Sequence, residues 1–510
     1  MLTNIILNSR RLLVFIFPFL LGALSVLSFQ PFNFSFINFF ILPALFLIIL
    51  YVNKKSKNTY RKKPYLKNFF FIGYFFGIGF FLTGTYWISY SLTFEDSFKF
   101  LIPFAVILIP LFLGLFFGLI MLATGPLIKK NFSSILFFCA SLSVIDYLRS
   151  KILTGFPWNL WAYSWSWFPE IIQLLNITGL FAFNLLSITF FCSPLLFILN
   201  NKSKFFYFST FILFFFFNYI YGSQVLNKKE NFNDSLKNNM FINFKIVSPN
   251  FDLKYNLTES DVEESIKDLI RYSEPEENKD TIFIWPEGVF TGYNFNDLLK
   301  FKNFFEDNFS SNHLIILGVN TYDEKDRGDI FNSLLILNDK LEVVYKYNKK
   351  KLVPFGEFIF YEDFFEKFGL KKITQGYKSF TKGSEQKNFI YKNLNILPLI
   401  CYEIIFPELT QSKKNNTNLI VNISEDAWFG GSIGPHQHFS KAIFRAIESD
   451  TYLIRSANKG FSAFIDNKGK VLKKLGPNET GSIELKVPIF NNNQKSRNDL
   501  IFFVLLFTYT

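Results

Sequence analysis

Long apolar stretches separated by short polar ones fill the chain up to about residue 221. A membrane-spanning helix needs about 20 mostly apolar residues. The pattern therefore predicts seven spans, at 12–28, 34–52, 68–91, 100–124, 131–148, 171–199 and 205–221. Because Arg10 and Arg11 precede the first stretch, a cleaved signal peptide is an alternative there, but six further spans favour a retained signal anchor. The apolar tail at 499–510 predicts an eighth span that is either tilted and incomplete or truncated.

Beyond a polar linker at 223–240, the pattern changes to short apolar runs with turn-like flanks. Seven runs have strand length: 241–247, 281–285, 313–318, 332–337, 395–400, 417–423 and 451–456. Helical patterns alternate with some of them, near 258–272, 296–306 and 435–449. We therefore expect a transmembrane helical domain at 1–222, an α/β domain at 241–490 and a C-terminal transmembrane segment at 498–510.

Positive charge lies mainly in alternate loops between the predicted spans. The stretch 54–67 holds seven lysines and arginines and no acid. The positive-inside rule then places the N-terminus in the cytoplasm and residue 222 onward on the outer side. The loop at 149–170 fits least, because it keeps Arg149 and Lys151. These loops account for much of the net charge of +12, so we expect no nucleic-acid partner.

The segment 155–167, G-F-P-W-N-L-W-A-Y-S-W-S-W, is dense in tryptophan. Tryptophan is common where a helix bundle meets the membrane–water interface. The segment therefore predicts an interfacial aromatic belt, or a surface that guides lipid toward a site.

Three motifs in the second half place a reactive side chain at or just beyond an apolar run. The first is I-F-I-W-P-E-G, in which Glu287 is either a general base at the edge of the core or a solvated loop residue. The second is Y-N-K-K-K-L-V-P-F-G-E-F, whose lysines are either exposed charge or a source of oxyanion stabilisation beside Glu357.

The third motif is I-L-P-L-I-C-Y-E, in which Cys401 directly follows a strand-like run. An isolated cysteine is usually a small core residue. Here Tyr402 and Glu403 follow at once, so the chain is leaving the core. A thiol needs a base and a positive neighbour to become a good nucleophile, and the first two motifs contain both.

A fourth stretch, N-I-S-E-D-A-W-F-G-G-S-I-G-P-H-Q-H at 422–438, predicts a shaped loop between a strand and a helix. His436 and His438 are weak candidates for metal binding, since one residue separates them and no carboxylate partner is obvious.

Together these motifs resemble those of the carbon–nitrogen hydrolase (nitrilase) superfamily. With the preceding spans and the 422–438 stretch, nearly the whole chain is similar to the membrane-bound apolipoprotein N-acyltransferase family. The resemblance implies a helical transmembrane bundle joined to an α/β nitrilase-like domain, an α-β-β-α sandwich.

The same resemblance implies a Glu-Lys-Cys triad. The implied roles are base for Glu287, oxyanion-side cation for Lys349 and nucleophile for Cys401, with Glu357, Tyr402 and Glu403 supporting the site. Substrate-binding positions are Tyr255, Trp428 and His436, and the family usually has tryptophan where S-P-N-F-D-L-K-Y ends in Tyr255.

The implied ping-pong reaction moves an acyl chain from a phospholipid to Cys401, and then to the amine of an S-diacylglyceryl-cysteine apolipoprotein. No cofactor or metal is implied. We expect a monomer in the bacterial inner membrane, with its catalytic domain on the periplasmic side. A membrane-tethered amidase or hydrolase that uses water is the alternative. A transporter or receptor is a third reading, but among charges inside the spans only Asp146 is clear, near a span end.

Overall fold

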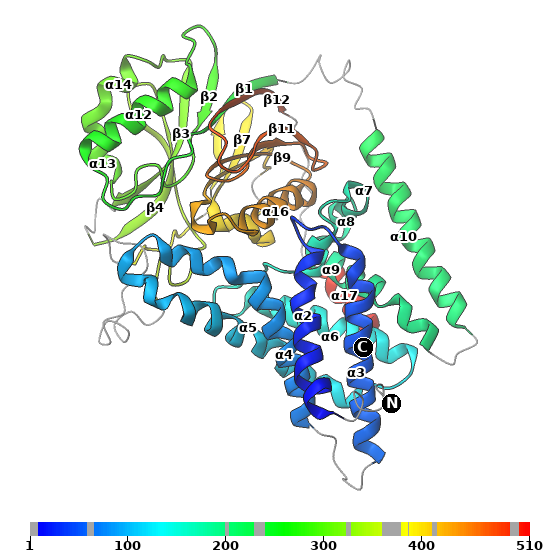
Figure 1. The fold of residues 1–510 in the computed structure, drawn as a ribbon. Coiled ribbons are helices and arrows are strands. Elements are labelled where there is room, and N and C mark those ends of the chain that lie inside the picture. Colours follow the sequence, from blue (N-terminus) through cyan, green and yellow to red (C-terminus); the bar gives the residue numbers. More distant parts are fainter. Residues whose placement is uncertain are drawn as a thin grey trace. The chain divides into compact units, whose positions relative to one another are not determined.

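The computed structural model describes residues 9–58, 66–198, 203–228, 240–322, 328–359, 379–385, 387–410, 416–489 and 499–509. The chain divides into two compact units. One comprises Met1–Asn227 with Arg497–Thr510, and the other comprises Lys228–Ser496. The first, the helical unit, is built of helices, and the second, the sandwich unit, carries the strands (Figure 1).

The α-helices of the helical unit differ widely in length. They are α2 (Phe17–Leu24), α3 (Asn38–Asn58), α4 (Leu66–Thr85), α5 (Ile102–Thr124), α6 (Phe132–Lys151), α7 (Pro169–Ile172), α8 (Leu175–Thr178), α9 (Leu180–Phe191), α10 (Lys204–Asn227) and α17 (Leu500–Tyr509). Among the described residues, five helical segments are long and apolar enough to cross a membrane: Ser35–Lys55, Leu66–Thr93, Asp96–Leu127, Phe132–Lys151 and Lys204–Asn227. The helical unit is therefore that of a multi-pass membrane protein.

Two of the predicted spans differ from the helices found. The first corresponds to the shorter apolar helix Leu12–Ser28. The stretch 171–199 was predicted as one span, but it is not one continuous helix, because the chain forms α7, α8, α9 and a 3-10 helix at Ser193–Ile198. Gly179 separates α8 from α9 with a φ of 75°, which a continuing α-helix cannot contain.

Glycines let three helices of this unit approach closely. A Cβ at Gly22 of α2 would lie 2.0 Å from the carbonyl oxygen of Phe76 in α4, and one at Gly73 of α4 would lie 2.1 Å from that of Phe117 in α5. Because lipid tails are as apolar as the side chains of the helices, helices in a membrane associate through close packing of this kind rather than through the hydrophobic effect.

The tryptophan-rich segment is part of the protein interior. Trp158, Trp161 and Trp165 are at most 1% exposed, and the Trp165 ring stacks on Phe191 of α9 at 5.0 Å. An aromatic belt or a lipid-guiding surface requires exposed rings, so both predictions are wrong for these three residues. Hydropathy and composition do not distinguish a tryptophan that packs inward from one that faces the interface.

The strands of the sandwich unit form two six-stranded mixed sheets. One has the order β12-β1-β2-β3-β4-β5 and the other has the order β11-β10-β9-β8-β7-β6. The strands are β1 (Met240–Ser248), β2 (Thr281–Ile284), β3 (His313–Tyr322), β4 (Ile330–Leu337), β5 (Val343–Asn348), β6 (Phe389–Tyr391), β7 (Leu394–Ile400), β8 (Leu419–Glu425), β9 (Tyr452–Asn458), β10 (Ser462–Ile465), β11 (Val471–Leu475) and β12 (Gly481–Ile489).

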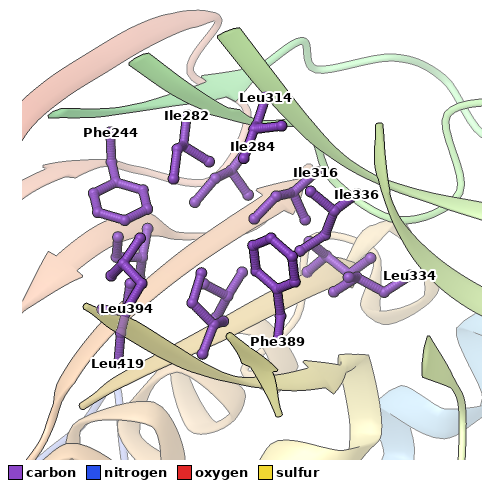
Figure 2. Close-up of a cluster of buried hydrophobic side chains, with 14 of the residues drawn as sticks. Phe244, Ile282, Ile284, Leu314, Ile316, Leu334, Ile336, Phe389, Leu394 and Leu419 are labelled. Carbon is purple, nitrogen blue, oxygen red and sulfur yellow. The ribbon is translucent and has the colours of Figure 1, made fainter. Parts of the chain in front are cut away.

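The two sheets pack face to face over a common apolar core. Figure 2 shows side chains of β1 to β4, among them Phe244 and Ile316, facing side chains of β6, β7 and β8 such as Phe389 and Leu419. The outer face of the first sheet is covered by α12 (Glu259–Ser273), α13 (Phe295–Leu298) and α14 (Lys302–Glu306). The long helix α16 (Gly434–Ser449) packs against β9 of the second sheet (Figure 1). These four layers confirm the predicted α-β-β-α sandwich.

Helix α12 illustrates how the sequence builds these layers. Thr258 and Asp261 form a reciprocal capping box that satisfies main-chain donors at its start. Its buried residues are spaced three or four apart and face the first sheet: Val262, Ile266, Leu269, Ile270 and Ser273.

All seven runs predicted as strands are strands, and the three helical predictions match α12, the α13–α14 region and α16. The predictions omitted β5, β6, β10, β11 and β12.

Candidate active site

The three side chains singled out in the sequence lie just beyond the ends of three strands. Glu287 follows β2, Lys349 directly follows β5, and Cys401 directly follows β7. The first two strands belong to one sheet and β7 belongs to the other. Residues far apart along the chain therefore meet where both sheets end.

Lys349 is the centre of a buried ion cluster. Its Nζ lies 2.9 Å from Glu357 Oε1 and 3.4 Å from Glu287 Oε1, and its side chain is 1% exposed. Burial by itself lowers the pKa of Lys349, but the carboxylates of Glu287 and Glu357 outweigh it and raise the pKa above its ordinary value. The ammonium therefore stays charged within the site.

Asn332 of β4 holds the two carboxylates together. Its Nδ2 donates to Glu287 Oε1 and to Glu357 Oε1, both at 2.7 Å. The Glu357 Oε2 atom accepts from the main-chain N–H of Val353 at 2.8 Å, which fixes the loop that carries this glutamate. Asn332 was missed in the sequence, because an asparagine inside an otherwise apolar strand gives no signal of chemistry.

Cys401 occupies a tight turn between β7 and a 3-10 helix at Cys401–Ile405. Its φ of 47° lies in the left-handed region, which a residue with a side chain rarely adopts. Strain of this kind persists where surrounding structure enforces it, commonly at functional sites. The thiol is 8% exposed, and its Sγ lies 4.0 Å from the main-chain oxygen of Glu425.

The charges of the ion cluster reach the thiol. Burial raises the pKa of Cys401, the carboxylate of Glu287 raises it further, and the ammonium of Lys349 opposes both effects. The residue is therefore a neutral thiol at neutral pH, and it becomes a nucleophile only when a base removes its proton.

Glu403 fixes the lysine loop and the cysteine turn relative to each other. Its Oε1 accepts from the Tyr347 hydroxyl at 2.8 Å and from the main-chain N–H groups of Lys350 and Lys351 at 2.7 and 3.0 Å. Its Oε2 accepts from the N–H of Ile400 at 2.8 Å. One fully buried carboxyl thus connects the residues flanking Lys349 with the residue before Cys401. The ring of Tyr402 lies 5.0 Å from that of Phe406, edge to face.

Each of the three expected substrate-binding residues has an aromatic neighbour. The ring centroids of Tyr255 and Trp428 lie 6.1 Å apart, so the structure brings these two together. His436, at the start of α16, instead packs edge-on against Phe461 at 5.1 Å. Burial and the nearby Lys474 charge lower the pKa of His436, so this imidazole is neutral at neutral pH.

His438 belongs to a buried network behind the site. Its Nδ1 lies 3.0 Å from Asp426 Oδ1, and Arg455 Nη2 donates to Asp426 Oδ2 at 2.8 Å. Burial lowers the pKa of His438 to about 4, and the Arg455 charge contributes. Burial alone raises the pKa of Asp426, but Arg455 and His438 reverse this and hold it below its usual range. In the described part of the chain, no three His, Cys, Asp or Glu side chains are arranged to hold a metal ion.

A buried thiol, a carboxylate whose charge acts on it and a buried ammonium are the parts needed for nucleophilic acyl chemistry. The two-sheet sandwich and this site define a carbon–nitrogen hydrolase, and residues 253–489 match the Carbon-nitrogen hydrolase family model. Residues 21–193 match the model described as Apolipoprotein N-acyltransferase N-terminal domain. The chain belongs to the apolipoprotein N-acyltransferase family.

Curated relatives match over most of both chains. The Apolipoprotein N-acyltransferase of Rickettsia typhi is 32% identical over 479 residues, which cover 92% of this chain and 91% of that protein. The protein of the same name from Bradyrhizobium diazoefficiens is 32% identical and covers 92% of this chain and 88% of its own. Among solved structures, the CN-hydrolase superfamily protein XC1258 from Xanthomonas campestris is 14% identical, with a TM-score of 0.36 over 49% of this chain and 91% of that chain.

Proposed function

We propose that this protein transfers an acyl chain from a phospholipid to the N-terminal amine of an S-diacylglyceryl-cysteine apolipoprotein, through a thioester on Cys401. Family membership supports N-acylation of lipoproteins as the overall activity. The observation that carries the mechanism is the buried Glu287–Lys349–Glu357 cluster, whose charges act on the Cys401 thiol.

In the first half-reaction, Cys401 Sγ attacks the carbonyl carbon of a phospholipid ester, and Glu287 accepts the thiol proton. The Lys349 ammonium stabilises the negative charge that develops on the carbonyl oxygen. When the tetrahedral intermediate collapses, the ester C–O bond breaks and the proton held by Glu287 passes to the departing alkoxide. The products are a thioester and a lysophospholipid.

In the second half-reaction, the free amine of the apolipoprotein attacks the thioester carbon. Glu287 takes a proton from the amine and returns a proton to the leaving thiolate, so Cys401 is regenerated as a thiol. The amide formed is the N-acyl group of the product. Because the thiol pKa is raised, the attack of Cys401 in the first half-reaction depends on transfer of its proton to Glu287.

Both substrates are anchored in a membrane, which gives a physical reason to join this site to apolar helices. We propose the bacterial inner membrane. With Leu180–Phe191 and Ser193–Ile198 together as the sixth of seven crossings, the distribution of lysine and arginine among the loops places the sandwich unit on the periplasmic side. The reaction as written balances without a cofactor or metal, and the proposed working unit is a monomer.

Hydrolysis is the competing function, because the same nucleophile can pass its acyl group to water. Purified protein in mixed micelles with phospholipid and an S-diacylglyceryl-cysteine peptide separates the two. We expect N-acyl peptide to form in step with lysophospholipid, and Cys401→Ala to abolish both. Free fatty acid without N-acyl peptide would establish the hydrolase instead.

A further inference from the structure

The carboxyl side chain of Glu425, at the end of β8, is buried beside the site and has no part in the reaction described above. The residue is 2% exposed. Its strand pairs in parallel with β7, so that Ile423 lies opposite Ile400, and this register brings Glu425 next to the turn that carries Cys401.

The main chain of Glu425 touches both reacting groups. Its N–H donates to Glu287 Oε2 at 3.1 Å, and its carbonyl oxygen lies 4.0 Å from Cys401 Sγ, the thiol being the donor. The orientation of this one residue therefore affects both the carboxylate that must receive the proton and the thiol that must release it.

The side chain of Glu425 holds that main chain in place. Oε1 accepts from the N–H of Ala427 at 2.9 Å, and Oε2 accepts from Asn458 Nδ2 at 2.9 Å. The side chain also packs on Gly288, where a Cβ would lie 2.7 Å from Glu425 Oε2. Only glycine fits at this position, directly after Glu287.

Asn458 extends the connection to the segment that leads to Tyr255. Its Oδ1 accepts from the Phe251 N–H at 2.8 Å, and its Nδ2 donates to the Phe251 carbonyl at 2.9 Å. These two bonds fix which end of the amide is the donor, so Nδ2 must face Glu425. Tyr255 follows four residues later and lies near Trp428.

We propose that Glu425 is a positioning residue for acyl transfer, which links the Tyr255-bearing segment, through Asn458, to the main-chain groups that orient Glu287 and Cys401. This inference rests on the proposed function. Glu425 is assigned no contact with substrate. The rate at which Cys401 is acylated should depend on a matched donor and acceptor in the Glu425–Asn458 hydrogen bond.

Reversing the donor and acceptor tests this pair. Glu425→Gln places an N–H against the Asn458 N–H, and Asn458→Asp places a second carboxyl against Glu425. The double variant Glu425→Gln/Asn458→Asp restores one donor facing one acceptor and keeps the acceptor for the Phe251 N–H. It loses only the donor to the Phe251 carbonyl.

The measurement is the rate constant for acylation of Cys401 by saturating phospholipid in full-length protein, followed by intact-mass spectrometry and expressed per folded molecule. We expect each single change to slow acylation about 10- to 100-fold, as small displacements of reacting groups do. The double variant should recover most of that loss. Asp252→Asn is the matched control, since its ion pair with Lys459 lies on the same segment but is exposed, and its rate should stay within about threefold of the unmodified protein.

A double variant no faster than the slower single would overturn the proposal. The proposal would also be overturned if the single variants gave less folded protein but the same rate constant per folded molecule as the unmodified protein. That result is expected for a purely structural role. If a single variant does not fold, Glu425→Ala supplies the comparison, and an unmodified rate there also contradicts the proposal. Absence of acylation in the unmodified protein would instead refute the proposed function.

Discussion

The Asp146–Arg149 pair of the helical unit (the helical cluster) and the Lys349 cluster of the sandwich unit (the sandwich cluster) are both buried, and they differ in how their charges balance. In the helical unit, Arg149 Nη2 lies 2.9 Å from Asp146 Oδ1 on the same helix, and Asn184 Nδ2 donates to Asp146 Oδ2 at 3.0 Å. One cation meets one anion there. In the sandwich unit, Lys349 faces two carboxylates, Glu287 and Glu357.

This difference separates a structural pair from a reactive one. The helical cluster is neutral, and its partners are local: Asp146 and Arg149 are three residues apart, and Arg149 also donates to the Phe156 carbonyl. The sandwich cluster has an excess of negative charge, drawn from separate strands and loops, next to a thiol. In the proposed mechanism, Glu287 of the sandwich cluster accepts the proton of that thiol.

The largest expected effect follows from removing the cation of the unbalanced cluster. Lys349→Met leaves Glu287 and Glu357 without their shared positive partner and removes the charge that stabilises the oxyanion. We expect N-acylation to fall by at least about 10²- to 10³-fold. The assay is product formation per folded molecule, with Lys346→Met on the exposed face of β5 as control. Retention of normal activity in Lys349→Met would remove the proposed role of this lysine.

Breaking the balanced helical cluster should lower the stability of the protein. Arg149→Met leaves Asp146 buried and unpaired, and we expect the free energy of unfolding to fall by about 3–5 kcal/mol. Asp146→Asn/Arg149→Met removes both charges, so most of that loss should return. Thermal unfolding of the full-length protein in detergent measures both variants. A double variant as unstable as Arg149→Met would show that the ion pair is not the source of the loss.

A buried histidine should make stability depend on pH. The pKa of His438 is lowered to about 4 in the folded protein, whereas an unfolded histidine titrates near 6.5. The unfolded state therefore binds more protons between these values. Stability from this group is complete above about pH 6.5 and declines as the pH falls toward 4, by up to about 3 kcal/mol. In His438→Gln, the unfolding midpoint should change less with pH between 6.5 and 4 than it does in the unmodified protein. An equal change in both proteins would assign the pH dependence to other groups.

A smaller effect is expected from the neutral partner of the sandwich cluster. Asn332→Leu removes the amide that donates to Glu287 and Glu357, so both carboxylates can shift while the Lys349 charge remains. We expect acylation of Cys401 to slow about 10- to 100-fold. Asn338→Ala, which removes the exposed side-chain hydrogen bonds of a turn, to Glu342 and to the N–H groups of Lys340 and Glu342, is the control. Equal rates for the two variants would mean that Asn332 does not position the cluster.

The sequence predicted those features that depend on local pattern. Buried strands such as β4 are continuous apolar runs, and a reactive residue directly after such a run stands out, as Cys401 does after β7. Lys349 follows a strand that was missed, and only the resemblance singled it out. Strands with exposed faces were missed, because β5 and β11 alternate irregularly and carry charge.

Features that depend on tertiary contact were not predictable in the same way. Hydropathy averaged over 171–199 does not register the break at Gly179, and it does not show that Trp161 packs inward. Asn332 and Asn458 look like ordinary strand residues. Their importance comes from the carboxyl groups that the fold brings to them.

The central claim is that Cys401 carries the acyl group, with Glu287 receiving its proton. Intact-mass and peptide mass spectrometry after incubation with phospholipid, without any apolipoprotein acceptor, tests this most directly. We expect one added acyl chain on the peptide that contains Cys401. It should be discharged when acceptor peptide is supplied, and it should be nearly absent in Glu287→Gln. An unmodified Cys401 in protein that still produces N-acylated peptide would contradict it.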